Sequence, residues 1–433
     1  MDAGHIFGVD LDDIRDQRWF AAKHERGQRL VIVDEARVPG GGPRLVVADV
    51  VSSSGNTDRY LLIMEVGSNR EPRIGDGRFA ALTRWILDRS PVKGARGGSF
   101  VPAVEPGVQL GLPQGERFVG DDQSNTIVGV GDRWLLKCYR RIHAGVHPEP
   151  ELLGALVDLP STPRLGATVI FDDGSALYTA LVLVERIPDV ETGWAGPIAR
   201  LAEVLDRPAE VEALERAAAE YAVFASAVGG LHEELRSRFS ARAVLPEDLN
   251  RWHRSARADL QLAQQITTGP ANSMLAKHRP RLERALAFDS GAGHRLQRIH
   301  GDLHLGQFLR RTDKVWIIDF EGDPQAGFEE RRRLDSPLLD LACLLRSLDH
   351  LLSATITRRP ERRIGDAPQA WRSRTREAVI ATYEQDQGPV DRILLRAFET
   401  HRELREFVYA ATVLPEWMHA PMFGIDALFE WPD

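Results

Sequence analysis

Three polar side chains between residues 299 and 323 have the types and the spacing that phosphoryl transfer needs. Asp302 follows an Ile-His-Gly run, Gln307 lies five residues after it, and Asp319 ends an apolar run twelve residues after Gln307. A loop carboxylate can orient or deprotonate a hydroxyl group, while an amide oxygen and a second carboxylate can bind a hard cation. These residues predict a phosphotransferase site in which Asp302 acts on the acceptor and Gln307 and Asp319 bind Mg²⁺.

A second set of polar residues lies where a β-hairpin is expected. Lys137 stands in the apolar strand 134–139, and the strand that pairs with it follows a polar turn. Backbone N–H groups and side-chain donors of such a turn can bind phosphates, and Lys137 can reach the α- and β-phosphates of ATP. The turn residues expected to bind ATP are Gln123, Ser124, Asn125 and Thr126.

Several motifs resemble one kinase superfamily. Residues 299–323 resemble the catalytic and metal loops of aminoglycoside-phosphotransferase-like kinases, which share the bilobal fold of eukaryotic protein kinases. Most members carry Asn where this chain has Gln307, and Gln there, followed by the letters DFEG, resembles the maltokinase branch. Residues 17–23 resemble the start of the cap domain that maltokinases carry before the kinase lobes. The resemblance covers nearly the whole chain.

The resemblance implies further contacts with the nucleotide. Glu151, or alternatively Glu149, begins the helix after the strand of Lys137 and would pair with that lysine, as in kinases. Glu185 and Ile187 end a strong strand where the hinge between the lobes is expected, and the backbone there would hydrogen-bond adenine. ATP and Mg²⁺ are therefore the expected cofactors.

The C-terminal stretch determines which acceptor is expected. Maltokinases carry a Tyr-Glu pair before an Arg-Pro-Asp-Trp segment, but here Ala410 follows Tyr409 and Leu414 precedes the proline. These differences argue against maltose and make the chain similar to actinobacterial glucosamine kinases. An amino sugar is a cation near neutral pH, so carboxylates and an aromatic platform are expected around it. Besides Asp302, the residues expected to contact it are His304, Glu403, Glu406, Glu416 and Trp417.

The expected reaction is transfer of the γ-phosphoryl group of ATP to the 6-hydroxyl group of glucosamine. One alternative is a maltokinase that forms maltose 1-phosphate, and others are an aminoglycoside phosphotransferase or a nucleotide-binding pseudokinase. The presence of Asp302, Gln307 and Asp319 together argues against a pseudokinase. The cap-like N-terminus argues against a plain resistance enzyme.

The elements that must position these residues change in type along the chain. Apolar or alternating segments between turn clusters predict strands over residues 30–65, and helical spacing follows at 77–89. A Gly- and Pro-rich stretch, 94–115, is expected to be an irregular connector. Further strands are expected up to about residue 187. From about residue 198 the apolar residues recur with the spacing of a helix, apart from a short β-like segment at 314–322.

This order fits an α+β protein, and the resemblance implies a bilobal, eukaryotic-protein-kinase-like fold with a β-rich N-terminal cap. The expected domains are the cap at 1–110, a nucleotide-binding small lobe at 111–187 and a helical lobe at 188–433 that carries the catalytic loop, the metal loop and the sugar site.

Composition excludes several other classes of protein. The chain of 433 residues has a net charge of −8, whereas a protein that binds the nucleic-acid backbone is normally basic. Its longest apolar stretch, 176–184, is too short to span a bilayer. Cys138 and Cys343 are the only cysteines, which excludes a disulfide framework and fits a reducing compartment. We therefore expect a cytoplasmic enzyme whose partners are ATP and a small sugar; the sequence does not set the oligomeric state.

Overall fold

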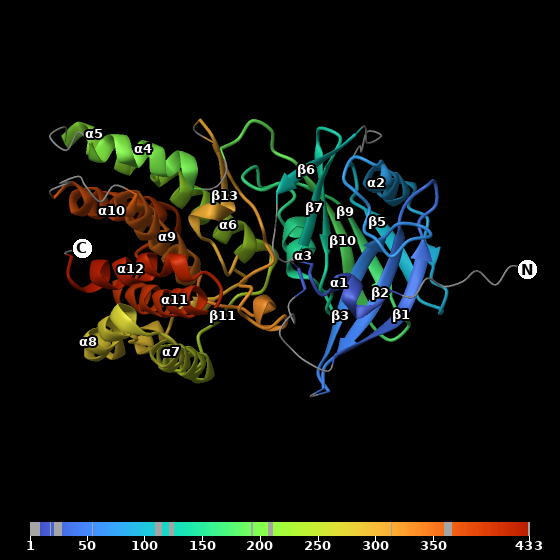
Figure 1. Cartoon of the computed structure of the whole chain (residues 1–433). Helices are drawn as coiled ribbons and strands as arrows, with labels where there is room; N and C mark the ends of the chain where they lie inside the picture. The colour runs from blue at the N-terminus through green and yellow to red at the C-terminus, as the bar shows by residue number, and fades with distance from the viewer. Residues whose placement is uncertain are drawn as a thin grey trace, which may run out of the picture. The chain divides into compact units, whose positions relative to one another are not determined.

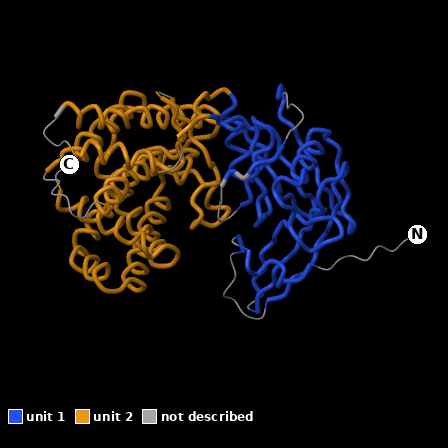
Figure 2. Tube along the Cα trace, turned by 45° about the horizontal axis from the view of Figure 1, so that its top comes forward, with its two compact units in different colours: residues 1–157, 163–188 blue, residues 158–162, 189–433 orange. Residues whose placement is uncertain are grey.

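The computed structural model describes all residues except 1–8, 18, 21–27, 54, 109–114, 121–124, 192–193, 207–210, 313, 359–365 and 432–433. The chain divides into two compact units. Unit 1 consists of residues 1–157 and 163–188, and unit 2 consists of residues 158–162 and 189–433 (Figure 2).

Unit 1 begins with a three-stranded antiparallel sheet in the order β1 (Arg29–Arg37), β2 (Arg44–Val51), β3 (Thr57–Met64). These strands confirm the β structure expected over residues 30–65. One face of the sheet packs against the short helix α1 (Leu11–Ile14) and against Trp19 and Phe20. The rings of Trp19 and Phe20 both contact the ring of Tyr60 on β3. β-Branched and aromatic residues favour such half-buried strands.

A seven-stranded antiparallel sheet makes up most of the rest of unit 1 (Figure 1). Helix α2 (Arg78–Asp88) precedes it in the chain, and helix α3 (Pro148–Ala155) follows β8. The strand order across the sheet is β4 (Val92–Lys93), β5 (Ser99–Val104), β9 (Leu165–Asp172), β10 (Leu177–Glu185), β8 (Trp134–Tyr139), β7 (Asn125–Val130) and β6 (Glu116–Gly120).

Strand β5 lies inside the stretch 94–115, so the expectation of an irregular connector there is wrong. All of β5 pairs with β9, from Ser99 opposite Asp172 onward. The cause is a turn that the sequence pattern does not reveal. The buried Asp34 carboxylate accepts hydrogen bonds from the backbone N–H groups of Arg96 (2.8 Å) and Gly98 (2.7 Å), which fixes the chain just before β5. The expected domain boundary at residue 110 stays a prediction.

Unit 2 is mostly helical (Figure 1). Among its described residues, β11 (Arg242–Ala243) pairs antiparallel with β12 (Arg295–Leu296), and β13 (Phe308–Arg311) forms a hairpin with β14 (Lys314–Ile317). Helix α12 was not expected from the sequence, because its apolar residues show little helical periodicity. The helices are α4 (Ala195–Leu205), α5 (Val211–Ala219), α6 (Ala222–Arg238), α7 (Pro246–Ile266), α8 (Gly269–Ala285), α9 (Pro337–Thr357), α10 (Ala367–Gln387), α11 (Arg392–Thr412) and α12 (His419–Phe429).

Helix α9 is the buried centre of unit 2 and packs against α4, α10, α11 and α12. Every residue from Asp340 to Thr355 is buried, including charged side chains. A helix that is apolar on all sides belongs inside a protein, and polar residues on it need partners there. The polar residues of α9 hold the functional loops. Among the described residues, no helix combines the length and the apolar character that crossing a membrane requires.

Candidate active site

The loop that carries Asp302 is anchored by a buried carboxylate on α9. Asp340 accepts hydrogen bonds from the backbone N–H groups of His300 (2.8 Å) and Gly301 (2.8 Å). The His232 imidazole lies 3.0 Å from the same carboxylate. Burial would raise the pKa of Asp340, but the hydrogen bond and charge of His232 outweigh it, so the pKa is lowered. Asp340 is thus held ionised, and it fixes the loop that carries Asp302.

The two expected metal ligands lie side by side in unit 2. The β13–β14 hairpin pairs Phe308 with Ile317, which returns the chain to Gln307, and Gln307 Nε2 donates a hydrogen bond to Asp319 Oδ2 (3.2 Å). Rotation of the amide by 180° would present Oε1 instead of Nε2. An amide oxygen and a carboxylate are oxygen ligands that suit Mg²⁺. The donor set therefore fits the metal that the sequence predicts.

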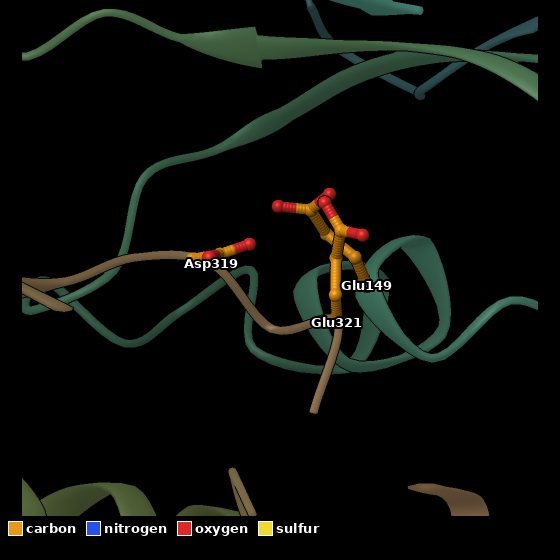
Figure 3. A group of neighbouring side chains, drawn as sticks. All are labelled: Glu149, Asp319 and Glu321. Carbon is orange, nitrogen blue, oxygen red and sulfur yellow. The ribbon is translucent and has the colours of Figure 1, made fainter. Parts of the chain in front are cut away.

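Glu321 adds a carboxylate that sequence reasoning missed. Asp319 and Glu321 both project from the segment after β14, and Glu149 comes from helix α3 of unit 1 (Figure 3). Carboxylate oxygens of Asp319 and Glu321 lie within 4.8 Å of each other. The letters DFEG contain both acids two residues apart, and that spacing was the signal for Glu321.

Asp302 is held by an arginine that the sequence analysis did not identify. Arg402 on α11 donates from Nη2 to Asp302 Oδ1 (2.6 Å) and from Nη1 to Asp323 Oδ2 (2.6 Å). Arg405, one turn later, lies 2.8 Å from the same Asp323 oxygen. Burial raises the pKa of Asp302 despite the charge of Arg402. For Asp323 the two arginines outweigh burial and lower the pKa.

A cavity of about 480 Å³ in unit 2 opens beside Asp302. Glu406 makes no hydrogen bond or ion pair with any residue that the structure describes, so its carboxylate remains available. Three residues that the sequence predicts for the acceptor, His304, Glu406 and Trp417, line this cavity together with Asp302. We name this space the acceptor cavity. Trp194, His350 and Tyr409 also line it, and the sequence analysis missed them.

Aromatic rings form one wall of the acceptor cavity. Trp417 meets Trp194 edge to face with ring centroids 6.0 Å apart, and it meets His350 in the same way at 6.0 Å. A flat, rigid indole of this kind can carry the apolar face of a sugar ring. This arrangement agrees with the role predicted for Trp417.

Two of the predicted acceptor residues do not line this cavity. Glu403 is completely buried in α11, where its carboxylate lies 3.0 Å from His350 Nε2 and 3.4 Å from Arg346 Nη1. The prediction that Glu403 contacts the acceptor directly is therefore wrong. Glu416 is exposed and does not line the cavity. Helical spacing alone could not reveal that Glu403 faces α9, whereas Glu406, three residues later, faces the cavity.

In unit 1 the predicted lysine forms a buried ion pair. Lys137 Nζ donates to both carboxylate oxygens of Glu149, at 3.0 and 2.8 Å. The Tyr139 hydroxyl also donates to this carboxylate. The lysine therefore pairs with Glu149, the second of the two candidates, and the preferred assignment to Glu151 is corrected. His147 caps α3 at its N-terminus, where its Nδ1 accepts a hydrogen bond from the backbone N–H of Glu149.

The other residues expected to bind ATP occupy strand ends. Asn125 and Thr126 begin β7, and the Thr126 hydroxyl accepts hydrogen bonds from Arg140 Nε (2.8 Å) and Nη2 (2.6 Å). Glu185 ends β10, and its backbone N–H donates to the Arg164 carbonyl (2.9 Å). Contacts of these residues and of Ile187 with ATP stay predictions. Gln123 and Ser124 lie outside the described residues.

The chain is similar to two curated glucosamine kinases. The protein from Mycolicibacterium smegmatis is 28% identical over 327 residues, which are 73% of this chain and 80% of the relative. The protein from Streptacidiphilus jiangxiensis is 26% identical over 376 residues, which are 84% of this chain and 83% of the relative.

Solved structures share the fold. A glucosamine kinase (crystal form B) matches with a TM-score of 0.76 and 22% identity over 95% of this chain and 96% of that one. A glucosamine kinase in complex with glucosamine, ADP and inorganic phosphate matches with a TM-score of 0.72 and 22% identity over 94% of each chain. These matches confirm the expected kinase-like fold.

Two family profiles match the chain. The profile described as the maltokinase N-terminal cap domain matches residues 14–89, as the segment 17–23 predicted. The profile described as the phosphotransferase enzyme family matches residues 116–407, which include Lys137, Asp302, Gln307 and Asp319. Because this second match extends over more than half of the sequence, the chain belongs to the phosphotransferase enzyme family.

Proposed function

We propose that this enzyme transfers the γ-phosphoryl group of ATP to the 6-hydroxyl group of glucosamine. The observation that carries the proposal is the acceptor cavity, in which the unpaired Glu406 carboxylate and the Trp417 ring accompany Asp302. The two curated relatives are named glucosamine kinases, and a solved structure of similar fold contains glucosamine, ADP and inorganic phosphate, which supports the same acceptor.

Asp302 is proposed to orient the acceptor hydroxyl and take its proton. Its Oδ1 is bound to Arg402, which leaves Oδ2 to accept a hydrogen bond from the hydroxyl group. The ion pair also fixes the carboxylate in one orientation. Kinases depend mainly on positioning the reacting groups and on neutralising charge. A carboxylate held in a fixed orientation is therefore expected to contribute more to the rate than a strongly basic one.

Lys137, Gln307 and Asp319 are proposed to serve the nucleotide. Lys137, held by Glu149, would contact the ATP phosphates, as the lysine of a lysine–glutamate pair does in kinases. Gln307 and Asp319 would hold Mg²⁺, which neutralises charge on the phosphates when it is bound.

Glu406 is proposed to distinguish glucosamine from neutral sugars. Its carboxylate can pair with the ammonium group of the amino sugar, and such a charge-assisted hydrogen bond is worth roughly 1.5–3 kcal/mol, or about 10- to 150-fold in affinity. The 6-hydroxyl group is the primary and least hindered alcohol of the sugar, so it can reach Asp302 without the ring entering the catalytic loop.

Maltose is the second candidate acceptor. The observation that favours it is the match of residues 14–89 to the maltokinase N-terminal cap domain. The absence of a carboxylate at Ala410 and of an arginine at Leu414 opposes it, because both groups belong to the maltokinase-like C-terminal pattern.

The test is kcat/KM for glucosamine, glucose, N-acetylglucosamine and maltose, measured side by side with ATP and Mg²⁺. We expect glucosamine to exceed glucose by at least tenfold. Acetylation removes the positive charge, so N-acetylglucosamine is expected to be a poor acceptor. A higher value for maltose would replace this proposal with the maltokinase reading, and equal values for glucosamine and N-acetylglucosamine would remove the role of charge.

A further inference from the structure

His350 on helix α9 lines the acceptor cavity, although most of its side chain is buried. Ser347 and Ala354 lie on the same face of α9, three residues before it and four residues after it, and they line the cavity too. The Ser347 hydroxyl is already engaged, since it accepts from the Leu305 backbone N–H (2.8 Å) and donates to the Leu344 carbonyl (2.7 Å). Ala354 has no polar side-chain atom. Of these three residues, His350 alone offers a polar group to an acceptor.

The imidazole of His350 is held in one orientation by its neighbours. Its Nε2 lies 3.0 and 3.1 Å from the two carboxylate oxygens of the fully buried Glu403. The Trp417 ring packs against it edge to face, with the ring centroids 6.0 Å apart. Its Nδ1 forms no hydrogen bond with any residue that the structure describes. Nδ1 is therefore the ring nitrogen that remains for an acceptor, and it needs little further ordering to bind one.

The pair of His350 and Glu403 decides whether Nδ1 carries a hydrogen atom. Burial would lower the pKa of His350, but the charge and the hydrogen bond of Glu403 outweigh it, so the pKa is raised. Burial also raises the pKa of Glu403, and the charge of His350 opposes that shift. When the pair holds two protons, one lies between Nε2 and the carboxylate and the other is on Nδ1. In that form Nδ1 is a hydrogen-bond donor.

The other charged groups around His350 act in both directions. Glu406 on α11 favours the protonated imidazole, whereas Arg346 on α9 opposes it. His419 on α12 adds no positive charge near neutral pH, because burial lowers its pKa. The remaining ionisable residues that line the same cavity are Asp302, His304, Asp323, Arg358, Arg402 and Tyr409. Glu403 is the group at hydrogen-bond distance from the ring, so it has the largest influence in favour of the proton.

We propose that His350 determines acceptor specificity by donating a hydrogen bond from Nδ1 to the 3-hydroxyl or the 4-hydroxyl group of the sugar. This inference rests on the proposed function, in which Asp302 binds the 6-hydroxyl group and Glu406 binds the 2-amino group. The anomeric hydroxyl group changes its configuration in solution, so it offers no fixed target. The 3- and 4-hydroxyl groups keep one orientation, and a charged donor such as an imidazolium forms a strong hydrogen bond with such a group.

The test compares glucosamine with its 3-deoxy and 4-deoxy analogues in the wild type and in His350→Gln. Glutamine keeps an N–H group for Glu403 in place of Nε2 but has no donor in place of Nδ1. Removing the contacted hydroxyl group is expected to lower kcat/KM about tenfold or more in the wild type and less than about threefold in His350→Gln. The analogue that shows this difference identifies the hydroxyl group.

The matched control is His253→Gln. It replaces a histidine of α7 that lies 3.2 Å from Asp289 and does not line the acceptor cavity. This variant is expected to respond to both analogues as the wild type does. Equal sensitivity to both analogues in the wild type and in His350→Gln would overturn the proposal.

A pH profile of the wild type tests the donor without relying on a variant. KM for glucose, which has no ionisable group in this range, is expected to rise as pH increases and His350 loses its proton, whereas His350→Gln should keep one KM throughout. A constant KM in the wild type overturns the donor role. Failure of the proposed function looks different, because wild-type glucosamine would then have no advantage over glucose. If that advantage exists, it should survive in His350→Gln, since Glu406 provides it.

Discussion

Arg402 bridges Asp302 and Asp323, with one guanidinium nitrogen 2.6 Å from each carboxylate. The carboxylate that we propose to be catalytic is therefore one half of a partly buried ion pair, and its partner lies one hundred positions later in the chain. Removing one partner of such a pair leaves the other charge uncompensated, which costs more than the pair itself contributes.

Asp302→Asn is expected to lower kcat by at least a thousandfold while ADP binding changes little. The amide keeps the size of the side chain but cannot take a proton from the acceptor hydroxyl. Steady-state rates with the best acceptor and calorimetric ADP affinity check this. Wild-type turnover by the variant would show that Asp302 is not the catalytic carboxylate.

Arg402→Met is expected to move the acidic limb of kcat/KM to higher pH. Burial already raises the pKa of Asp302, and Arg402 opposes that shift. Because the proposed mechanism needs the ionised carboxylate, we expect activity to fall as pH drops through this pKa, and loss of Arg402 to make the fall begin at higher pH. Arg402→Lys keeps the charge and should shift the limb less. An acidic limb that stays at the wild-type pH in both variants would contradict the electrostatic coupling between Arg402 and Asp302.

Glu406→Gln is expected to lower kcat/KM for glucosamine about 10- to 150-fold and to change that for glucose less than threefold. The reason is that only glucosamine carries the ammonium group that the carboxylate would bind. Glu416→Gln is the matched control, since this exposed glutamate does not line the acceptor cavity. An equal loss for both sugars would show that Glu406 only supports the fold.

Glu149→Gln is expected to raise KM for ATP about tenfold or more, whereas Glu151→Gln is expected to leave it within a factor of two. Lys137 donates to both oxygens of Glu149, and without this carboxylate the lysine loses its fixed position. Measurement of KM for ATP in both variants separates the two candidates. A larger effect of Glu151→Gln would restore the preferred sequence assignment.

The sequence predicts a site residue best when the residues that fix its position lie close to it in the chain. Asp302, Gln307 and Asp319 lie within eighteen residues, and one hairpin brings the last two together, so their spacing was informative. Arg402 belongs to a distant helix and looks like an ordinary surface residue of an amphipathic pattern. Only the packing of α11 against α9 reveals it.

The same physical reason explains the error at Glu403 and the missed strand β5. Whether a glutamate on a helix faces a cavity or a buried histidine depends on how the helix is rotated about its axis in the tertiary structure. Composition does not encode that rotation. Strand β5 depends on Asp34, more than sixty residues earlier, whose carboxylate holds the preceding turn. The long helices α7, α9 and α11 were predictable because each has a sustained helical pattern.

Glu399→Gln is expected to destabilise the protein by about 3–5 kcal/mol at neutral pH, because it breaks a buried network on α9, α10 and α11. Glu399 accepts from Arg376 at 2.6 and 3.0 Å and lies 3.0 Å from Arg346. Burial would raise the pKa of Glu399, but the two arginines outweigh it and hold the pKa well below its usual range.

The stability that this lowered pKa contributes is present above the ordinary glutamate pKa and is lost as pH falls below it. Wild-type unfolding free energy should therefore decline between about pH 5 and pH 3, and the decline should be shallower in Glu399→Gln. Denaturant unfolding across this range is the measurement. Glu283→Gln, which removes the exposed partner of Arg279, is the control and should keep the wild-type slope. Parallel curves for the wild type and Glu399→Gln would show that Glu399 does not govern acid stability.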